Sequence, residues 1–439
     1  MPKMKDSGIE WVGQIPEDWN VKKGKYCFAQ TNDRGNNKSL VLLSPTQNYG
    51  VIPQELYEQL SGFNAVKLNE KTDLNLLKTV HKGAYVISLR SFQGGFEYSE
   101  YEGVVSPAYQ VFYPTIKIDD RFYKYLFKTQ VFIDKMNSYT MSLRDGKNIA
   151  FADFGRTYIP IPPVEYQMIV ADFLDRKCSE IDSLRADIEA EIENLEEYKK
   201  SVITEAVTKG LDKNAPMKDS GVEWVERIPS TWKTTKVKYL FNSGKGLGIT
   251  KDNLIDEGLP VISYGQIHSK DNDGVSLAPQ LLRFVDCSYK RLFPQCEVEK
   301  YDFVFADTSE DYDGCGNCVY KRNDNVVFGG YHSIVLHSKY KKDNRFLAYL
   351  FLTDDWRKQI RSYVSGVKVF SVTNKLIMNT SVVLPPEEEQ RIISDYLDMK
   401  CKEINEIIQA RKEQIEIFAE YKKSLIYEYV TGKKEVPNE

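Results

Sequence analysis

The sequence predicts a mixed α/β (α+β) fold in which two variable domains are joined by two long antiparallel helices that pair as a coiled-coil spacer. Three observations support this prediction. An opening phrase recurs 213 residues later, a helix-forming segment recurs 223 residues later, and dissimilar segments rich in strand-forming residues lie between the repeats. We therefore expect a pseudo-two-fold, circularly organised chain.

The opening phrase reads MKDSGIEWVGQIPEDWNVKKGKYCF at residues 4–28 and MKDSGVEWVERIPSTWKTTKVKYLF at residues 217–241, with 15 of 25 positions identical. A repeat of this period is too long for a solenoid and indicates two whole domains. The chain of 439 residues is also longer than one hydrophobic core usually serves.

The second repeat begins at a Pro-Pro pair, at residues 162–163 and again at 385–386. No Gly or Pro interrupts residues 165–207, so we predict a long helix there and a matching helix near the C-terminus. Apolar residues recur at heptad spacing, with Leu184, Ile192 and Tyr198 between them in the first copy. The predicted stripe contains Leu174, Ile181, Ile188, Leu195 and Val202, and in the second copy Leu397, Ile404, Ile408, Ile415, Phe418 and Leu425.

Two matching apolar stripes in one chain favour an intramolecular coiled coil of roughly 60 Å. The alternative is that each helix lies on a globular core. The central helix is followed directly by the second copy of the opening phrase. The last helix lies near the C-terminus, and the first copy of the phrase lies at the N-terminus. A two-fold relation between the halves thus predicts that the two termini lie side by side.

These repeats divide the chain into four segments. We predict variable domains over 1–161 and 213–384, and spacer helices over 162–212 and 385–439. Runs rich in Val, Ile, Tyr and Phe predict strands within 84–89, 104–114, 259–267, 301–307 and 329–337. One helix is expected to follow in each variable domain, over 120–139 and 344–364.

Composition is ordinary for a soluble globular protein, with 42% hydrophobic and 28% charged residues. No run is apolar enough to suggest a membrane span, and the first residues lack the apolar core of a secretory signal, so we expect a cytoplasmic protein. Seven mostly scattered cysteines favour reduced thiols. A formal net charge of −4 argues against coating of nucleic acid by bulk electrostatics.

Four motifs in this order resemble the specificity (S) subunits of type I restriction-modification enzymes across essentially the whole chain. They are GIEWVGQIPEDW at 8–19, SLRSFQGGFEYSEYEGVVSPAY at 88–109, ADTSEDYDGCGNC at 306–318 followed by GGYHSIVL, and the Pro-Pro start of each long helix. In that family each variable segment is a target recognition domain. The two long helices form an antiparallel spacer that also docks two methyltransferase subunits.

The resemblance implies a non-catalytic subunit that reads an asymmetric bipartite sequence in double-stranded DNA. It also implies two methyltransferase (M) subunits that bind S-adenosylmethionine and two restriction/translocase (R) subunits that use ATP and Mg²⁺. Adenine methylation or restriction would then be performed by these partners. No cofactor or metal is expected on this chain, and no membrane partner.

In the first domain, Arg90 supplies a planar bidentate donor and Gln93 an amide suited to adenine, while neighbouring glycines permit close backbone approach. An ordinary strand and glycine turn, with Arg90 in a surface ion pair, remains the alternative. The candidate DNA-binding residues here are Arg90, Ser91, Gln93, Gly94, Gly95, Tyr98, Tyr101, Arg144 and Lys147.

The candidates in the second domain are Tyr264, Gln266, His268, Ser309, Glu310, Asp311, Tyr312, Tyr331 and His332. Carboxylates near 307–313 do not fit a calcium loop, because Tyr320 stands where the bidentate Glu is required. They remain base-reading candidates, although a cap or turn role for Asp307 and Asp313 is at least as favoured. The single CxxC at Cys315 and Cys318 lacks an evident second ligand pair for zinc.

Two other functional classes are alternatives to this interpretation. One is a coiled-coil scaffold whose variable domains bind protein partners. The other is a catalytic restriction or modification enzyme, for which the sequence contains no adenine-methyltransferase motif, helicase motif or hydrolase triad. The Gly-rich run at 244–248 does not match a P-loop.

Overall fold

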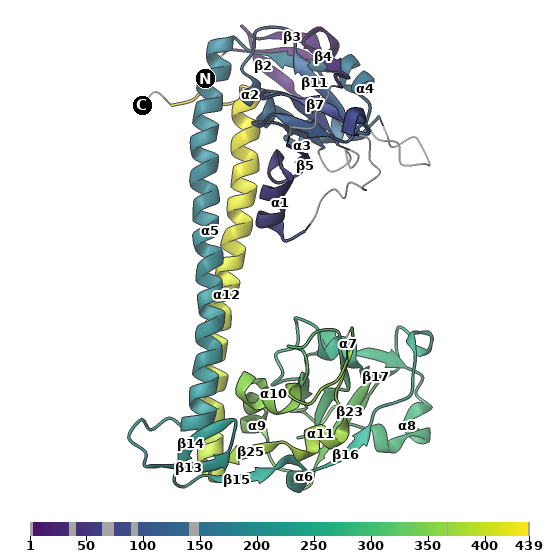
Figure 1. The fold of residues 1–439 in the computed structure, drawn as a ribbon, viewed down its shortest axis with the longest axis vertical. Helices are drawn as coiled ribbons and strands as arrows, with labels where there is room; N and C mark the ends of the chain where they lie inside the picture. Colours follow the sequence, from purple (N-terminus) through teal and green to yellow (C-terminus); the bar gives the residue numbers. More distant parts are fainter. Residues whose placement is uncertain are drawn as a thin grey trace. The chain divides into compact units, whose positions relative to one another are not determined.

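The chain forms two compact units, shown in Figure 1. Unit 1 comprises Met1–Glu189 and Lys412–Glu439, and unit 2 comprises Ala190–Arg411. Each unit therefore contains one variable domain and a part of each long helix. The computed structural model describes residues 3–34, 41–63, 74–88, 95–139, 149–366 and 368–437.

Unit 1 is a mixed α/β domain. Its strands are β1 (Met4–Ile9), β2 (Gly13–Pro16), β3 (Asn20–Lys23), β4 (Phe28–Thr31), β5 (Leu43–Thr46), β6 (Gly50–Pro53), β7 (Lys78–Val80), β8 (Tyr85–Ile87), β9 (Phe96–Tyr98), β10 (Gly103–Val105), β11 (Gln110–Pro114) and β12 (Tyr158–Ile161). Its helices are α1 (Gln54–Ser61), α2 (Asp120–Leu126), α3 (Gln130–Asn137), α4 (Phe151–Arg156), the first part of α5 (Val164–Lys209) and the last part of α12 (Glu387–Val430).

Unit 2 is built in the same way. Its strands are β13 (Met217–Val222), β14 (Val225–Pro229), β15 (Lys233–Lys236), β16 (Phe241–Lys245), β17 (Leu259–Ile262), β18 (Arg283–Val285), β19 (Phe303–Ala306), β20 (Thr308–Ser309), β21 (Cys318–Tyr320), β22 (Phe328–Gly329), β23 (Ser333–Ser338), β24 (Phe370–Ser371) and β25 (Ser381–Leu384). Its helices are the last part of α5, α6 (Val237–Leu240), α7 (Tyr264–Ile267), α8 (Tyr289–Leu292), α9 (Arg345–Leu352), α10 (Asp354–Arg361), α11 (Asn374–Asn379) and the first part of α12.

The central sheets of the two units have matching strand orders. The order is β4-β11-β8-β9 in unit 1 and β16-β23-β19-β21 in unit 2, and all neighbouring strands are antiparallel. Residues 88–95 connect β8 to β9, and residues 307–317 connect β19 to β21. The two dissimilar polar motifs of the sequence therefore occupy the same topological position in each unit.

The repeated opening phrase folds into the same bulged hairpin twice. Strand β1 pairs with β2, and β13 pairs with β14, each with a register shift after the MKD segment. Asp6 Oδ1 accepts the backbone N–H of Gly8 (3.0 Å), and Asp219 Oδ1 accepts that of Gly221 (2.7 Å). Both glycines have positive φ, +66° and +72°, which a residue with a Cβ rarely adopts. The sequence repeat is thus also a repeat of backbone conformation.

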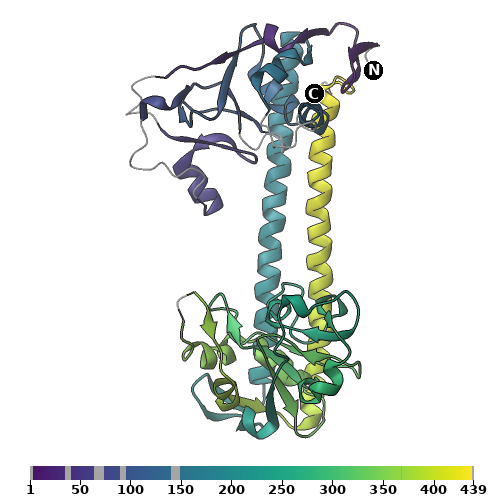
Figure 2. The same cartoon turned by 90° about the vertical axis from the view of Figure 1, so that its right-hand side faces the viewer.

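The long helices α5 and α12 pair in antiparallel fashion in both units, as predicted (Figure 2). In unit 1 the ring of Phe173 lies 4.6 Å from that of Tyr429, and Lys422 pairs with Asp182 at 2.6 Å. Of these two contacts, the one that uses the earlier residue of α5 uses the later residue of α12, so the helices run in opposite directions.

The same helix contact recurs in unit 2. Lys199 Nζ donates to Asn405 Oδ1 (2.8 Å), and these residues are the repeat equivalents of Lys422 and Asp182. Further along, Arg411 pairs with Glu191 at 3.0 Å. The coiled coil is therefore made of two equivalent sets of contacts.

Burial along the helices follows most of the predicted stripe. The buried positions are Leu174, Ile181, Ile188, Leu397, Ile404, Ile408 and Leu425, and the partly buried ones are Leu195, Val202, Ile415 and Phe418. Leu184 and Tyr198, which lie between the predicted stripe positions, are 48% and 55% exposed. The contact follows the predicted stripe alone, because two paired helices cover only one seam of each other.

The single helix predicted after each sheet is in fact two helices. The break falls at Thr129 between α2 and α3, and at Thr353 between α9 and α10. Both residues have extended backbone, and each hydroxyl donates to the carbonyl three residues earlier (2.7 Å). The Thr353 hydroxyl also accepts the N–H of Trp356 as an N-cap. Apolar periodicity continues across each threonine. The sequence pattern therefore predicts one helix where the threonine separates two.

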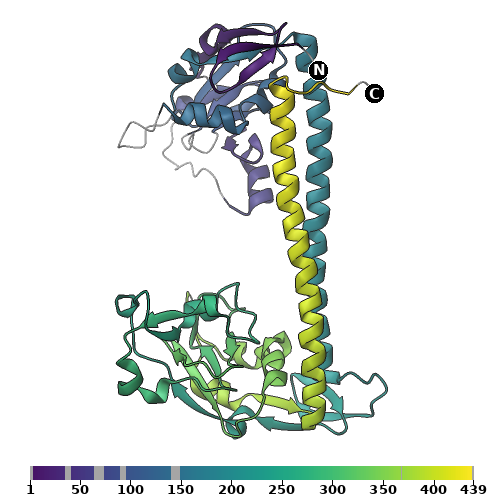
Figure 3. The ribbon, with the colours of Figure 1, turned by 180° about the vertical axis from the view of Figure 1, so that it is seen from behind.

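The circular organisation is visible at the ends of the chain. In unit 1, Gly432 after α12 packs against Pro16 and Trp19 of the opening segment. In unit 2, Gly210 after α5 packs in the same way against Pro229 and Trp232. The N- and C-terminal ends of unit 1 accordingly lie near each other (Figures 1 and 3).

Candidate nucleic-acid interface

The predicted residues of the first domain fall into four groups. Gly95 accepts the N–H of Ser88 (2.8 Å) and closes the β8–β9 hairpin. Tyr98 was expected near DNA but is buried, and its hydroxyl donates to Asp120 Oδ2 (2.7 Å), so the structure places it in the core. Tyr101 is 39% exposed. The remaining candidates lie outside the described residues: Arg90, Ser91, Gln93, Gly94, Arg144 and Lys147.

In the second domain, four predicted residues come together in a partly exposed group that we call the Tyr–His cluster: Tyr264, His268, Tyr331 and His332. The Tyr264 ring centroid lies 5.7 Å from that of His332 and 6.2 Å from that of Tyr331. Backbone bonds fix the group, since Tyr264 N donates to the Tyr331 carbonyl (3.1 Å) and Tyr331 N donates to Ser263 Oγ (3.0 Å). Residues 67 apart in sequence are thus held together.

His268 attaches this cluster to the β19–β21 connection. Its Nε2 lies 2.8 Å from the Thr308 carbonyl oxygen, and its Nδ1 lies 3.0 Å from Asn317 Nδ2. Both ring nitrogens are therefore engaged within the protein. Gln266 has a similar internal role, because its Oε1 accepts the N–H of Ser263 (3.3 Å) and caps the short helix α7.

His332 is held in a different way. Its Nδ1 lies 2.7 Å from Asp307 Oδ1, and its backbone carbonyl accepts the N–H of Asp307 (3.1 Å). His332 has φ of +52°, a left-handed conformation that is uncommon for a residue with a side chain. The two reciprocal bonds to Asp307 stabilise this backbone and fix the ring.

The β19–β21 connection presents both buried and exposed candidates. Ser309 is buried, and its hydroxyl accepts the N–H of Asp311 (3.4 Å), so it supports the loop rather than a ligand. Glu310 and Asp311 are exposed. Tyr312 is 47% exposed, and its ring lies 5.8 Å from that of Phe370. Carboxylate acceptors and an aromatic face are therefore available to a partner here.

Two glycines allow the backbone to approach closely beneath the Tyr–His cluster. A Cβ on Gly330 would collide with Ser263 Oγ, and one on Gly246 would collide with the Gly330 carbonyl and Ser333. Gly246 belongs to the Gly-rich run that did not match a P-loop. Its role is to let β16 and the segment before β23 pack without intervening side chains.

Sequence reasoning missed three exposed lysines beside these residues. Lys245 ends β16 next to Gly246, Lys270 follows His268 by two positions, and Lys368 precedes Phe370 by two. None of the three forms an ion pair or hydrogen bond within the described part of the chain. Adjacency in sequence to the polar motifs was the available signal.

Within the described residues, no group of three or more His, Cys, Asp or Glu side chains is arranged to hold a metal ion. Cys315 and Cys318 of the CxxC are both buried and unpaired. Burial raises the pKa of Cys318 to about 12, so its thiol is protonated at neutral pH.

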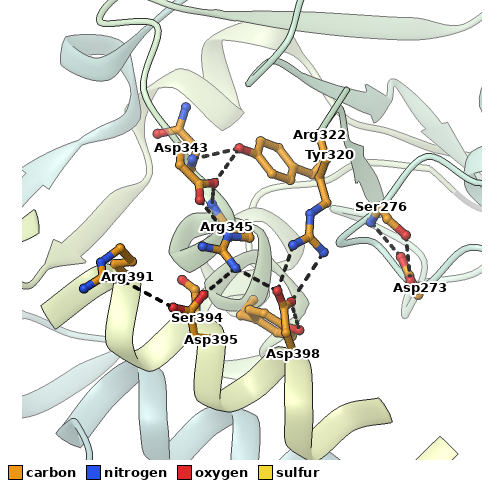
Figure 4. A network of polar contacts seen from close by, with 12 residues as sticks. Asp273, Ser276, Tyr320, Arg322, Asp343, Arg345, Arg391, Ser394, Asp395 and Asp398 are labelled. Atoms are coloured by element: carbon orange, nitrogen blue, oxygen red, sulfur yellow. Dashed lines mark hydrogen bonds and ion pairs between the residues drawn. The ribbon is translucent and has the colours of Figure 1, made fainter. Parts of the chain in front are cut away.

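A polar network docks the second domain onto α12 (Figure 4). Arg345 of α9 pairs with Asp343 (2.6 Å), with Asp395 (2.7 Å) and with Asp398 (2.8 Å). The Tyr349 hydroxyl donates to Asp398 (2.7 Å), which also pairs with an arginine that follows β21. Burial alone would raise the pKa of Asp398, but the hydrogen bonds to the arginines and the tyrosine outweigh it and lower the pKa.

Unit 1 contains the equivalent docking network. Arg121 of α2 pairs with Asp119 (3.0 Å), Asp172 (2.8 Å) and Asp175 (3.1 Å), and the Tyr125 hydroxyl donates to Asp175 (2.6 Å). Residues of the variable domain and of the repeated helix thus form the same contact in both halves.

A family model for the type I restriction modification DNA specificity domain matches residues 16–194 and again residues 229–417. The chain belongs to this family. Both matches begin at the repeated Ile-Pro of the opening phrase and end at equivalent positions of the two long helices. Each family domain therefore contains one variable domain and the helix that follows it.

Named relatives agree with this assignment. The chain is 24% identical to the type I restriction enzyme MjaVIII specificity subunit of Methanocaldococcus jannaschii, over 69% of this chain and 68% of that protein. It is 25% identical to the EcoKI specificity subunit of Escherichia coli, over 55% of this chain and 50% of that protein.

Two solved structures share the fold. A chain from a study of complex assembly and conformational transition of the type I restriction-modification system superimposes with a TM-score of 0.70 at 15% identity, covering 96% of this chain and 99% of that chain. The HsdS subunit from Thermoanaerobacter tengcongensis gives a TM-score of 0.52 at 15% identity, covering 96% and 98%. Among the described residues of this specificity-family chain, no helix is long and apolar enough to span a bilayer.

Proposed function

We propose that this chain is the sequence-specific double-stranded DNA recognition subunit of a type I restriction-modification complex. It reads an asymmetric bipartite target, one half-site with each variable domain, and directs adenine methylation or restriction by partner subunits. The chain itself performs no bond chemistry and acts in the cytoplasm.

The observation that carries this proposal is the position of the dissimilar polar motifs. Two equivalent four-stranded sheets place unlike residues in the same connection, 88–95 in unit 1 and 307–317 in unit 2. A shared scaffold with unlike residues at one position suits the reading of two different short sequences. It supports an asymmetric target better than a palindromic one.

The chemistry of the second connection suits the major groove. Hydrogen-bond acceptors such as Glu310 and Asp311 can accept from the cytosine amino group, and exposed Tyr331 offers both an aromatic face and a hydroxyl. The neighbouring exposed lysines supply the charge needed at phosphates despite the net charge of −4.

Two copies of one methyltransferase subunit are the partners that the repeat favours. Exposed apolar side chains on the long helices recur at equivalent positions: Ile169 with Ile392, Leu184 with Ile407, and Tyr198 with Tyr421. Because the same exposed apolar residues occur twice on this chain, the two sites suit two copies of one partner protein. S-adenosylmethionine would be bound by these subunits, and ATP and Mg²⁺ by two further restriction/translocase subunits.

The test is a map of methylated bases in host DNA with and without this gene. We expect one asymmetric bipartite adenine-methylated motif to disappear on deletion and to return on complementation. A chain in which Tyr331→Ala and Lys368→Ala are combined should alter one half-site only. Loss of no motif, with the partner methyltransferase expressed, would contradict the proposal.

A scaffold whose variable domains bind proteins is the rival function, and the exposed apolar residues of the helices are compatible with it. The salt dependence of DNA binding distinguishes the two functions. A DNA reader loses affinity steeply as salt rises because counterions are released from the phosphates. Binding of duplex DNA that is insensitive to salt, or absent, would favour the scaffold.

A further inference from the structure

The two histidines of the Tyr–His cluster differ in how many ring nitrogens the protein uses. His268 has both nitrogens within hydrogen-bonding distance of protein atoms. His332 uses Nδ1 for Asp307, and its Nε2 has no hydrogen bond within the described part of the chain. The His332 side chain is 37% exposed. Of the two, His332 alone has a ring nitrogen available to a ligand.

The protein also fixes where that nitrogen points. His332 adopts a left-handed backbone at φ +52° directly before β23, and Asp307 is joined to it by a backbone bond as well as by the side-chain bond. Sparsely populated backbone conformations persist where the surroundings enforce them, and they concentrate at functional sites. The neighbouring Tyr331 ring lies 4.0 Å from the His332 ring and limits its rotation.

The bond to Asp307 determines the protonation pattern of the neutral ring. An ionised carboxylate can only accept hydrogen bonds, so Nδ1 of His332 must carry the hydrogen. Neutral imidazole carries one hydrogen on its two nitrogens, which leaves Nε2 as an acceptor. In the major groove an acceptor on the protein must meet a donor on the base. The donors there are the N6 amino group of adenine and the N4 amino group of cytosine.

We infer that His332 is a base-reading acceptor whose tautomer is set by Asp307, and that it recognises the amino group of an adenine or cytosine in the half-site of unit 2. This inference rests on the proposed function. His332 is the specificity-determining residue, and Asp307 is a positioning residue that acts through it. Guanine and thymine are rejected at this position because they present only acceptors to Nε2.

The test is selection of bound duplexes from a random DNA pool by the full chain assembled with its methyltransferase partner. Asp307→Asn tests the tautomer, since its amide can donate to Nδ1 as well as accept from it, so that Nε2 is no longer held as an acceptor. We expect one position of one half-site to change from adenine or cytosine towards guanine or thymine, by roughly 10-fold in relative enrichment. The other half-site is the internal control.

A matched control is Asp324→Asn, which follows β21 and lies outside the β19–β21 connection. Its side chain is 80% exposed and pairs with Lys300 at 2.9 Å, so the substitution removes the same charge without altering the His332 tautomer. We expect an unchanged motif. His332→Gln, whose amide both donates and accepts, should relax the discriminated position while leaving the other positions intact.

The outcomes separate the inference from the function beneath it. An unchanged motif for Asp307→Asn would overturn the setting of the tautomer by the carboxylate. An unchanged motif for His332→Gln, or a loss spread evenly over all positions, would overturn the role of His332 and leave DNA recognition standing. Failure of the unmodified assembly to enrich any sequence would defeat the proposed function and the inference together. If Asp307→Asn proves unstable, a motif for His332→Gln that matches the unmodified one is sufficient to refute the inference.

Discussion

The docking network predicts a measurable coupling between Tyr349 and Asp398. Tyr349→Phe removes only a hydroxyl whose oxygen lies 2.7 Å from the carboxylate. The tyrosine is 2% exposed, whereas the Asp398 side chain is 27% exposed. A hydrogen bond to a charged group contributes about 1.5–3 kcal/mol, and partial exposure places this one at the lower end, about 1.5 kcal/mol.

The assay is a double-mutant cycle with Asp398→Ala, followed by urea unfolding and by hydrogen exchange of the α9 amides. Exchange localises the loss, because sub-global opening of the docked helix is detected separately from global unfolding. We expect a coupling energy of about 1–1.5 kcal/mol between the two side chains. Reduced protection should be confined to α9 and its contacts on α12.

Unit 1 provides the matched pair, Tyr125 and Asp175, at 2.6 Å. The same cycle there should give a similar coupling and should reduce protection of α2 while leaving α9 unchanged. A coupling below about 0.5 kcal/mol in both pairs would refute the reasoning, because it would mean that these bonds are as weak as exposed ion pairs.

Acid provides a second check on the same pair. The pKa of Asp398 is lowered in the folded chain from its ordinary value of 3.8. A lowered carboxyl pKa contributes stability that is fully present above the unfolded value and is lost as pH falls through the folded value. The coupling should accordingly be constant from pH 7 to about pH 5 and fade below pH 4.

Four further predictions concern other regions. Lys368→Ala should weaken binding to all duplexes and reduce the slope of log K against log salt by about 1. Burial raises the pKa of Glu97 to about 7, although its lysine partner acts to lower it. The free energy of unfolding should therefore fall as pH rises from 4.5 to 7, and Glu97→Gln should remove the matching decline in melting temperature. A chain opened at Asn214 with its original termini joined should fold and direct methylation of the same motif. Four residues inserted at both Ile188 and Arg411 add about 6 Å to each helix and should widen the unspecified gap by one or two base pairs, as read from methylation maps.

The fold was largely predictable because its signals are local and occur twice. The helix-forming run after each Pro-Pro pair predicted α5 and α12, and the repeated MKDSG encodes the same bulge through Asp6 and Asp219. The break at Thr353 was not predictable, since apolar periodicity continues across it. Leu184 lies between the predicted stripe positions and is exposed, and spacing alone does not show which flank of a stripe faces the partner helix.

The candidate site was predictable only as residue types in polar motifs. Tyr98 stands in a polar stretch, yet all residues of β9 are buried because this strand packs between the sheet core and α2. The bond between Asp307 and His332 joins positions 25 apart that only the β19–β23 pairing brings together. Sequence spacing gave no reason to associate them, and a turn or cap role for the aspartate was at least as favoured.

The two units also show how docking and reading are separated within a variable domain. Arg121 and Tyr125 lie in the helix segment RFYKYLF at 121–127, which recurs as RFLAYLF at 345–351. Arg345 and Tyr349 therefore repeat the same contacts against equivalent aspartates. The β8–β9 and β19–β21 connections, in contrast, differ in sequence. A variable domain can therefore change the residues that it presents to DNA while it retains the contacts that fix it to its helix. A new half-site requires changes in one connection and its neighbours, and the docking network need not change with them.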